Sequence, residues 1–359
     1  MTVPPTRLED SYGRVMRDLR ISVTDRCNFR CLYCLPETEE AANFYRSKYN
    51  PLKNPHPLRP IPRAWKPKSE LLTFEEIERV ARSAVRLGIQ KLRVTGGEPL
   101  LRRDLPDLIR RLAGLSGVED LAMTTNGFLF ASQARSLREA GLTRVSFSLD
   151  SLDRDNFRKL TGRDGLHEVL DAIAVAKTEG YSPVKVNAVI IRGMNDHEVE
   201  DLARFAAGQG LHMRFIEFMP LDSSRAWLKE MVVPAREILD RLSAALTLIP
   251  VPPAHPAETA RRWQLQGASG GEIGLIAPVS EPFCGHCNRL RLTADGKIRT
   301  CLFSLGEHDL RPWLRGERAN GDPELGAELA RITGLKEDRH HIGEPDFVQP
   351  ERTMSCIGG

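Results

Sequence analysis

Six of the seven cysteines fall into two compact groups, and these groups are the residues best suited to chemistry. Cys27, Cys31 and Cys34 have the spacing C-x3-C-x2-C. Structural zinc sites use four ligands, often as cysteine pairs, whereas ferredoxin runs have two-residue gaps and a fourth cysteine. Three thiolates with no fourth cysteine nearby predict a four-iron cluster that leaves one iron open to a ligand. Structural zinc is the alternative.

The second group has the spacing C-x2-C-x13-C and consists of Cys284, Cys287 and Cys301. A zinc ribbon completed by His286 or His308 explains this spacing as well as an iron–sulfur cluster does. Beside a first cluster, a second cluster with an open iron is favoured. Arg289 and Arg291 alternate on an expected strand, so both guanidinium groups point the same way. Their forked donors suit a polyphosphate.

The composition is that of an ordinary folded protein. Of the 359 residues, 41% are hydrophobic and 28% are charged, which excludes global disorder. Lys and Arg number 51 and Asp and Glu 48, a balance that argues against binding to a nucleic-acid polymer. We expect no membrane span, because no apolar run is long enough, and no signal peptide in Met1–Asp10. An odd number of unevenly spaced cysteines does not suit a disulfide framework and indicates a reducing cytoplasm.

Short β-rich runs alternate with helical patterns through much of the chain. The expected strands are Leu19–Val23, Lys91–Val94, Leu121–Thr124, Val145–Leu149, Val184–Ile190 and Met213–Phe218. The clearest helix is Thr73–Gly88, which begins with a capping box of Thr73 and Glu76. Strands alternating with helices predict an α/β fold with parallel strands. Six units favour a partial (β/α)6 TIM-type barrel over an open doubly wound sheet, with the active face at the strand C-termini.

Two proline-rich segments interrupt this rhythm. Residues 37–69 carry six prolines between Pro51 and Pro67, and we expect an extended surface insertion there. Ile249–Pro256 has four prolines and is expected to be a linker. The sequence therefore predicts a barrel over residues 1–248 and a smaller C-terminal module over residues 249–359.

The first cysteine group, with aromatic Tyr33 before its last member, resembles the signature of the radical S-adenosylmethionine enzymes. The resemblance implies that the open iron binds S-adenosylmethionine and that its cleavage yields a 5′-deoxyadenosyl radical. Gly96-Gly97-Glu98-Pro99 is similar to the family's segment after the second strand. Its glycines allow close backbone approach, and Glu98 is expected to accept a hydrogen bond from an ammonium group. The S-adenosylmethionine contacts that the resemblance implies are Tyr33, Gly97, Ser148 and Met219.

Both cysteine groups together resemble the GTP 3′,8-cyclase family, or molybdenum cofactor biosynthesis protein A. The likeness runs from Leu19–Cys27 through Phe283–Arg291 to a C-terminal Gly358-Gly359. It implies two [4Fe-4S] clusters, the second meeting the guanine base, and no catalytic side chain beyond the clusters and S-adenosylmethionine. It also implies conversion of GTP to (8S)-3′,8-cyclo-7,8-dihydroguanosine 5′-triphosphate. The implied GTP contacts are Arg20, Arg93, Thr124, Lys185, Arg289, Leu290 and Arg291.

The resemblance carries expectations about partners as well. An electron donor such as a flavodoxin or ferredoxin supplies the reductant, and cyclic pyranopterin monophosphate synthase takes the product. The chain is expected to be a monomer or homodimer. The Gly358-Gly359 tail is expected to reach the active-site cavity, whereas Cys356, His340 and His341 are treated as surface features.

Two other functions fit part of the sequence. A radical enzyme that modifies a peptide also carries a cysteine-rich C-terminal extension, although such extensions usually need more cysteines than the three present here. A non-enzymatic zinc or electron-transfer protein explains the cysteines but neither the Gly-Gly-Glu-Pro segment nor the paired arginines.

Overall fold

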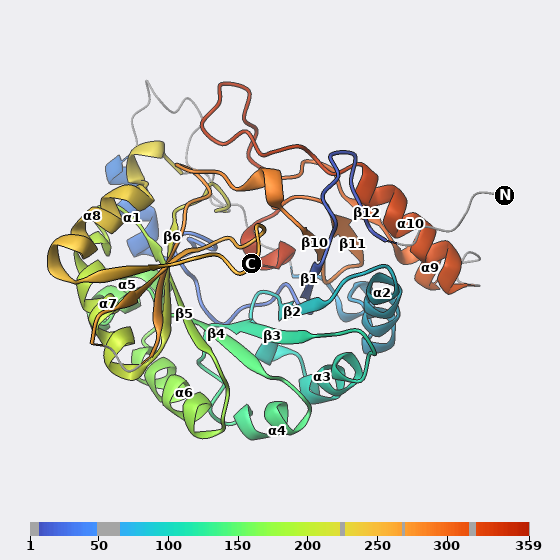
Figure 1. Cartoon of the computed structure of the whole chain (residues 1–359), viewed down its shortest axis with the longest axis horizontal. Helices are drawn as coiled ribbons and strands as arrows, with labels where there is room; N and C mark the ends of the chain where they lie inside the picture. The colour runs from blue at the N-terminus through green and yellow to red at the C-terminus, as the bar shows by residue number, and fades with distance from the viewer. Residues whose placement is uncertain (1–6, 49–64, 223–226, 268–269, 316–320, 359) are drawn as a thin grey trace.

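A curved sheet of parallel strands forms the frame of the molecule, and helices cover its outer side (Figure 1). The computed structural model describes residues 7–48, 65–222, 227–267, 270–315 and 321–358. The six expected strands are confirmed as β1 (Asp18–Ser22), β2 (Lys91–Thr95), β3 (Asp120–Thr125), β4 (Arg144–Ser148), β5 (Val184–Ile190) and β6 (His212–Glu217). They pair in this order, each parallel to the next, as a partial barrel requires.

Amphipathic helices pack against the outside of these strands. They are α2 (Phe74–Arg86), α3 (Leu105–Ala113), α4 (Ala134–Glu139), α5 (Arg154–Thr161), α6 (Leu166–Thr178), α7 (Val199–Gln209) and α8 (Ala235–Ala245). The capping box that the sequence predicts at the start of α2 is present, since Thr73 and Glu76 bond each other's backbone N–H groups. The buried face of α2 is apolar, with Ile77 and Val80 fully inaccessible. The capping box at the start of α2 and the apolar face that it buries therefore both favour the helix at this place.

The C-terminal third extends both edges of the same sheet. Its strands are β7 (Leu248–Val251), β8 (Arg261–Leu265), β9 (Glu272–Ile276), β10 (Arg289–Leu292), β11 (Lys297–Arg299) and β12 (His308–Asp309). Strand β9 pairs parallel with β6, and β10 pairs parallel with β1. The result is one open sheet of 12 strands. The prediction of a linker over Ile249–Pro256 is therefore wrong for its first three residues, because Ile249 to Val251 lie in edge strand β7.

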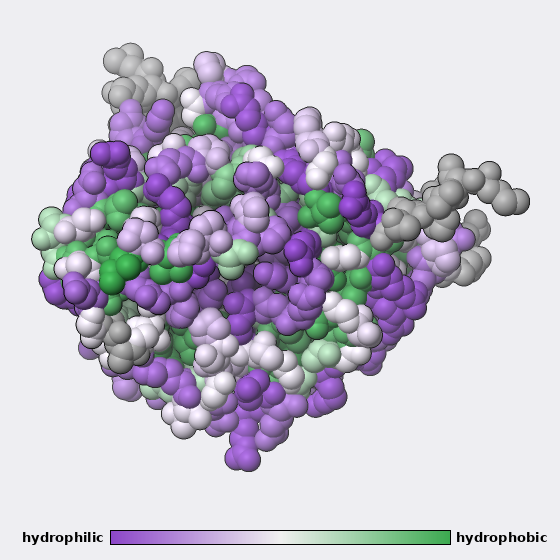
Figure 2. Space-filling model, viewed as in Figure 1, coloured by the Kyte–Doolittle hydropathy of each residue, from purple (hydrophilic) through white to green (hydrophobic). Residues whose placement is uncertain are grey.

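Three short or peripheral helices complete this third: α9 (Arg311–Arg315), α10 (Asp322–Gly334) and α11 (Met354–Ile357). Helix α10 packs on α2. The face of the molecule in Figure 2 is predominantly hydrophilic, with scattered hydrophobic residues. Among the helices of the described residues, none is long and apolar enough to cross a membrane.

The expectation of an extended insertion is wrong for its first part. Residues Glu39–Lys48 form helix α1, whose Ala41 and Tyr45 are buried. The signal was local, because Thr38 caps the Ala41 N–H and Ala41, Phe44 and Tyr45 have helical spacing. The prolines further along obscured it. Residues 49–64 of the insertion lie outside the described part of the chain.

Candidate active site

The first cysteine group lies in the loop after β1 and lines a cavity at the C-terminal ends of the strands. Cys27, Cys31 and Cys34 are free thiols, each partly buried. Burial chiefly raises the pKa of Cys27 to about 11 and the pKa of Cys31 well above its ordinary value. These thiols therefore stay protonated unless a metal centre takes the protons' place.

The spacing of the sulfur atoms distinguishes a cluster from a single ion. Among the described residues, one set of three His, Cys, Asp or Glu side chains has all its possible metal-ligand atoms within 4.8 Å of one another. This set consists of His341, Glu344 and Asp346. Neither cysteine group is that compact, whereas zinc with Zn–S bonds of about 2.3 Å would bring its sulfurs roughly 3.8 Å apart. Neither cysteine group is therefore arranged around a single zinc ion, and three thiolates without a fourth protein ligand suit a four-iron cluster with one open iron.

The insertion holds the loop of the first cysteine group from both of its ends. The Tyr45 hydroxyl donates to the Leu32 carbonyl at 3.0 Å, between two of the cysteines. At the other end, the Lys66 N–H donates to Asp25 Oδ2 at 2.8 Å. Trp65 lies under the Arg30 guanidinium, 5.5 Å from it. The insertion thus supports the loop and leaves the three cysteines facing the cavity.

The structure brings the four expected S-adenosylmethionine contacts together with the first cysteines. Tyr33, Gly97, Ser148 and Met219 all line the same cavity. A Cβ atom at Gly97 would lie 2.2 Å from the Arg26 carbonyl oxygen, so only glycine fits there. The Tyr33 hydroxyl donates to Asp150 Oδ2 at 2.7 Å, which fixes the aromatic ring between Cys31 and Cys34.

Glu98 connects several segments of the fold through its carboxyl group. It is fully buried, and it accepts hydrogen bonds from Leu100 N–H at 3.1 Å, the Thr125 hydroxyl at 2.7 Å and Asn126 N–H at 2.7 Å. A carboxylate can accept about four hydrogen bonds, so the expected hydrogen bond from an ammonium group to Glu98 stays a prediction. Its carboxyl group joins the glycine loop after β2 to the end of β3, a long-range contact that the sequence does not reveal.

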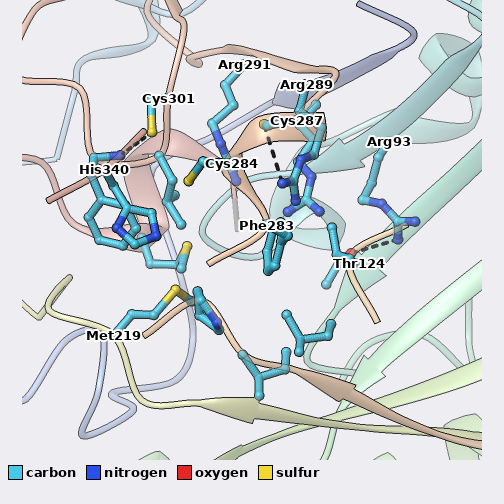
Figure 3. A pocket seen from close by; sticks show the side chains of 18 of the residues that line it. Arg93, Thr124, Met219, Phe283, Cys284, Cys287, Arg289, Arg291, Cys301 and His340 are labelled. Carbon is cyan, nitrogen blue, oxygen red and sulfur yellow. Dashed lines mark hydrogen bonds between the residues drawn. The ribbon is translucent and has the colours of Figure 1, made fainter. Parts of the chain in front are cut away.

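The second cysteine group lines a neighbouring cavity (Figure 3). Cys284, Cys287 and Cys301 lie together there, and Arg289 and Arg291 reach in from β10. The Arg289 Nη2 atom lies 3.4 Å from Cys287 Sγ. Burial opposes ionisation of Cys287, but the cations of Arg289 and Lys336 outweigh it and lower its pKa to about 6. A thiolate is thus favoured at this ligand even before metal binds.

The two cavities adjoin. Five residues line both: Thr124, Asn187, Ile216, Met219 and Met354. Of these, Thr124 and Met219 were predicted from the sequence, whereas Asn187 and Ile216 follow only from the alternation of side chains along β5 and β6. Ligands in the two cavities would therefore meet across a shared wall.

Buried basic side chains lie between the cavities and the far end of the barrel. Arg20 and Arg93 line the second cavity and a connected cavity of about 430 Å³, which Lys185 also lines. No carboxylate among the described residues forms an ion pair with these three side chains, and the Nε atoms of Arg20 and Arg93 have no hydrogen-bond partner. Burial and neighbouring cations lower the pKa of Lys185 to about 6. Asp18 and Asp120 line the same cavity and act in the opposite direction on these pKa values, and a bound anion would further stabilise the charged forms.

Two further residues complete the account of the cationic site. The sequence missed Arg214 on β6, which lines both of these cavities. Leu290 is 1% exposed and packs in the core, so its side chain lines neither cavity. Only its main chain can reach a ligand.

The C-terminal tail enters the barrel, as the position of the chain end in Figure 1 indicates. Gly358 has a φ of 74°, and a Cβ atom there would lie 2.6 Å from Thr95 Oγ1. The Arg291 guanidinium donates to the carbonyl oxygens of Ile357 and Gly358. Gly359 lies outside the described residues.

The expectation that His340 and Cys356 are surface features is wrong. The His340 ring lines the second cavity and packs edge-on against Phe303, with ring centroids 5.2 Å apart. Cys356 is partly buried against the apolar cluster that contains Phe303. His341, in contrast, pairs with Glu344 at 2.8 Å near the surface.

Comparisons with known families agree with this site. Residues 21–206 match the radical SAM superfamily, and residues 211–342 match the family described as Molybdenum Cofactor Synthesis C. Fold and cysteine cavities thus define a radical S-adenosylmethionine enzyme with two [4Fe-4S] clusters. A relative in Acidothermus cellulolyticus named GTP 3′,8-cyclase is 47% identical to this chain, over 95% of this chain and 88% of the relative. A relative of the same name in Rhodopirellula baltica is 44% identical, over 99% of this chain and 93% of the relative. The chain belongs to the GTP 3′,8-cyclase family.

Solved structures confirm the fold. SuiB of Streptococcus suis has a TM-score of 0.57 at 15% identity, over 82% of this chain. A second structure of SuiB, described as bound to S-adenosylmethionine, has a TM-score of 0.56. This chain spans 63% of the SuiB chain. At such low identity the likeness concerns the fold alone.

Proposed function

We propose that the chain binds GTP across the barrel, with the guanine at the second cysteine group and the triphosphate among Arg20, Arg93 and Lys185. The reaction is the cyclisation of GTP to (8S)-3′,8-cyclo-7,8-dihydroguanosine 5′-triphosphate, the first step of molybdenum cofactor biosynthesis. The observation that carries the orientation is the set of buried basic side chains, without ion pairs to the described carboxylates, in cavities connected to Cys284, Cys287 and Cys301.

The chain's own residues position the reactants. When bound, the first cluster and S-adenosylmethionine supply the one-electron chemistry that removes the C3′ hydrogen of the ribose. Thr124, Asn187 and Met219 stand between the two cavities, so they set how closely the two ligands approach. Ile216, Met219 and Met354 give this junction an apolar wall that excludes water.

The proposal extends to partners and assembly. The first cluster needs an external electron, and a small redox protein such as a flavodoxin or ferredoxin supplies it. The product passes to cyclic pyranopterin monophosphate synthase. The chain acts as a monomer or homodimer in the cytoplasm, with residues 1–248 as the barrel and residues 249–359 as the part that holds the second cluster.

Loss of one cation should weaken GTP binding much more than guanosine binding. Arg93→Gln is expected to reduce GTP affinity by roughly 1.5–3 kcal/mol, the cost of a charge-assisted hydrogen bond, or about 10–150-fold. Guanosine carries no phosphate, so its affinity should change little. Anaerobic calorimetry on the holoenzyme measures both. Arg135→Gln, on the exposed face of α4, is the matched control. Equal losses for GTP and guanosine would place the triphosphate elsewhere.

GTP binding should also take up a proton at Lys185. In the free chain, burial and then Arg214, Arg144 and Arg93 lower its pKa to about 6, so the amine is mostly neutral at pH 7.5. A bound triphosphate favours the ammonium form and raises that pKa. Uptake should approach about one proton per GTP, and affinity should fall as pH rises above 6.

Calorimetry in two buffers of different ionisation enthalpy measures this uptake directly. Lys185→Met should abolish the buffer dependence while leaving the iron content unchanged. Identical binding enthalpies in both buffers for the unmodified chain would show that Lys185 does not face the triphosphate.

A further inference from the structure

A buried lysine connects the two segments that supply the second cysteine group. Lys336 follows helix α10 and is 3% exposed. Its ammonium group donates to the Arg289 carbonyl at 3.2 Å and to the Thr300 carbonyl. Arg289 stands two residues after Cys287, and Thr300 directly precedes Cys301. One side chain therefore fixes the distance between these two ligand-bearing segments.

The charge of Lys336 has no acidic partner within the described part of the chain. Among the described residues, no carboxylate lies within ion-pair distance of its Nζ atom. The carboxylate of the neighbouring Glu337 accepts hydrogen bonds from the hydroxyls of Thr300 and Ser304 instead. Burying an ammonium group without a counter-charge is costly. Two carbonyl groups offset that cost only in part, so the charge requires an anion nearby.

The three thiols of the second group are where that anion forms. Burial disfavours the charged form of Cys284, Cys287 and Cys301, and the Lys336 ammonium acts in the opposite direction on each pKa. Its field thus reaches all three ligands. A four-iron cluster held by three thiolates carries a net negative charge, which grows by one unit on reduction. A fixed cation nearby stabilises the reduced form more than the oxidised form.

We propose that Lys336 is a positioning residue of the second cluster, which holds its two ligand segments together and raises its reduction potential. This inference rests on the second cluster proposed at Cys284, Cys287 and Cys301. It does not depend on how GTP is oriented, so the GTP-affinity experiment on Arg93 tests a separate claim.

Three substitutions separate the charge from the hydrogen bonds. Lys336→Arg keeps both, Lys336→Gln keeps donors but loses the charge, and Lys336→Met loses both. Lys297→Met is the matched control, because Lys297 pairs with Glu307, which Arg299 and Arg352 also contact. Mediated redox titration of the holoenzyme, followed by electron paramagnetic resonance, measures both clusters. The same titration of a variant with alanine at Cys27, Cys31 and Cys34 identifies the reduction step that belongs to the second cluster.

In Lys336→Gln, the ratio of reduced to oxidised second cluster at a fixed potential should fall about tenfold, a midpoint about 59 mV lower. Lys336→Arg and Lys297→Met should stay near the unmodified value. Loss of second-cluster iron from the Gln and Met variants, with retention in Lys336→Arg, would also support a required charge. An unchanged midpoint in Lys336→Gln with full iron content would overturn the proposal.

Discussion

Replacing Cys27, Cys31 and Cys34 together by alanine should abolish S-adenosylmethionine cleavage and remove about half of the bound iron. Two four-iron clusters hold about eight irons per chain when both sites are full. The sulfur ligands of the two groups line separate cavities, so loss of the first group leaves the second intact. Iron and sulfide analysis of anaerobically purified protein, with chromatography of 5′-deoxyadenosine, measures both effects.

The seventh cysteine provides the control. Cys356 is partly buried near the tail but lines neither cavity, so Cys356→Ala should keep its full iron content and its cleavage activity. GTP affinity of the triple variant should also persist, because the cations lie on the strands and not in the first cysteine loop. Zinc in the second site of the anaerobically purified protein would contradict the assignment of two clusters.

Local pattern sufficed where a residue's role follows from its own strand or loop. The family resemblance implied Arg20, Arg93 and Lys185 as GTP contacts, and their places on expected strands agree with side chains that line the barrel. Cysteine spacing placed the first trio in a single cavity, since one short loop holds it, whereas the antiparallel pairing of β10 and β11 brings Cys301 to Cys284 and Cys287. The order of the six strands followed from the alternation with helices.

Contacts between distant segments could not be predicted in the same way. The Glu98 carboxylate accepts hydrogen bonds from Thr125 and Asn126 at the end of β3, and its own Gly-Gly-Glu-Pro segment does not indicate these partners. His340 was expected at the surface, because nothing in its own segment indicates the packing against Phe303. Lys336 also gave no signal, since its partners lie in β10 and after β11. Such roles depend on tertiary packing alone.

Deleting Gly358 and Gly359 should sharply lower the GTP-dependent formation of 5′-deoxyadenosine. The Gly358 carbonyl accepts a hydrogen bond from Arg291, a buried cation of the second cavity, and its backbone lies against Thr95 at the end of β2. Without Gly358, Arg291 keeps only the longer contact to the Ile357 carbonyl, at 3.4 Å, so its guanidinium group is less well oriented. A displacement of about 1 Å at a reacting centre costs on the order of 100-fold in rate. We therefore expect a 10- to 100-fold loss, with iron content, melting temperature and GTP affinity nearly unchanged.

A single methyl group should reproduce part of this effect. Gly358→Ala strains a residue whose φ is 74° and places a Cβ atom 2.6 Å from Thr95 Oγ1, so the tail must move. Gly208→Ala is the matched control, because Gly208 lies in helix α7 and a Cβ atom there would have no neighbour within 4 Å. Assays of 5′-deoxyadenosine at saturating GTP compare the two variants with the deletion. Full turnover by the truncated chain would show that the tail only occupies the cavity, and that Arg291 is held by other groups.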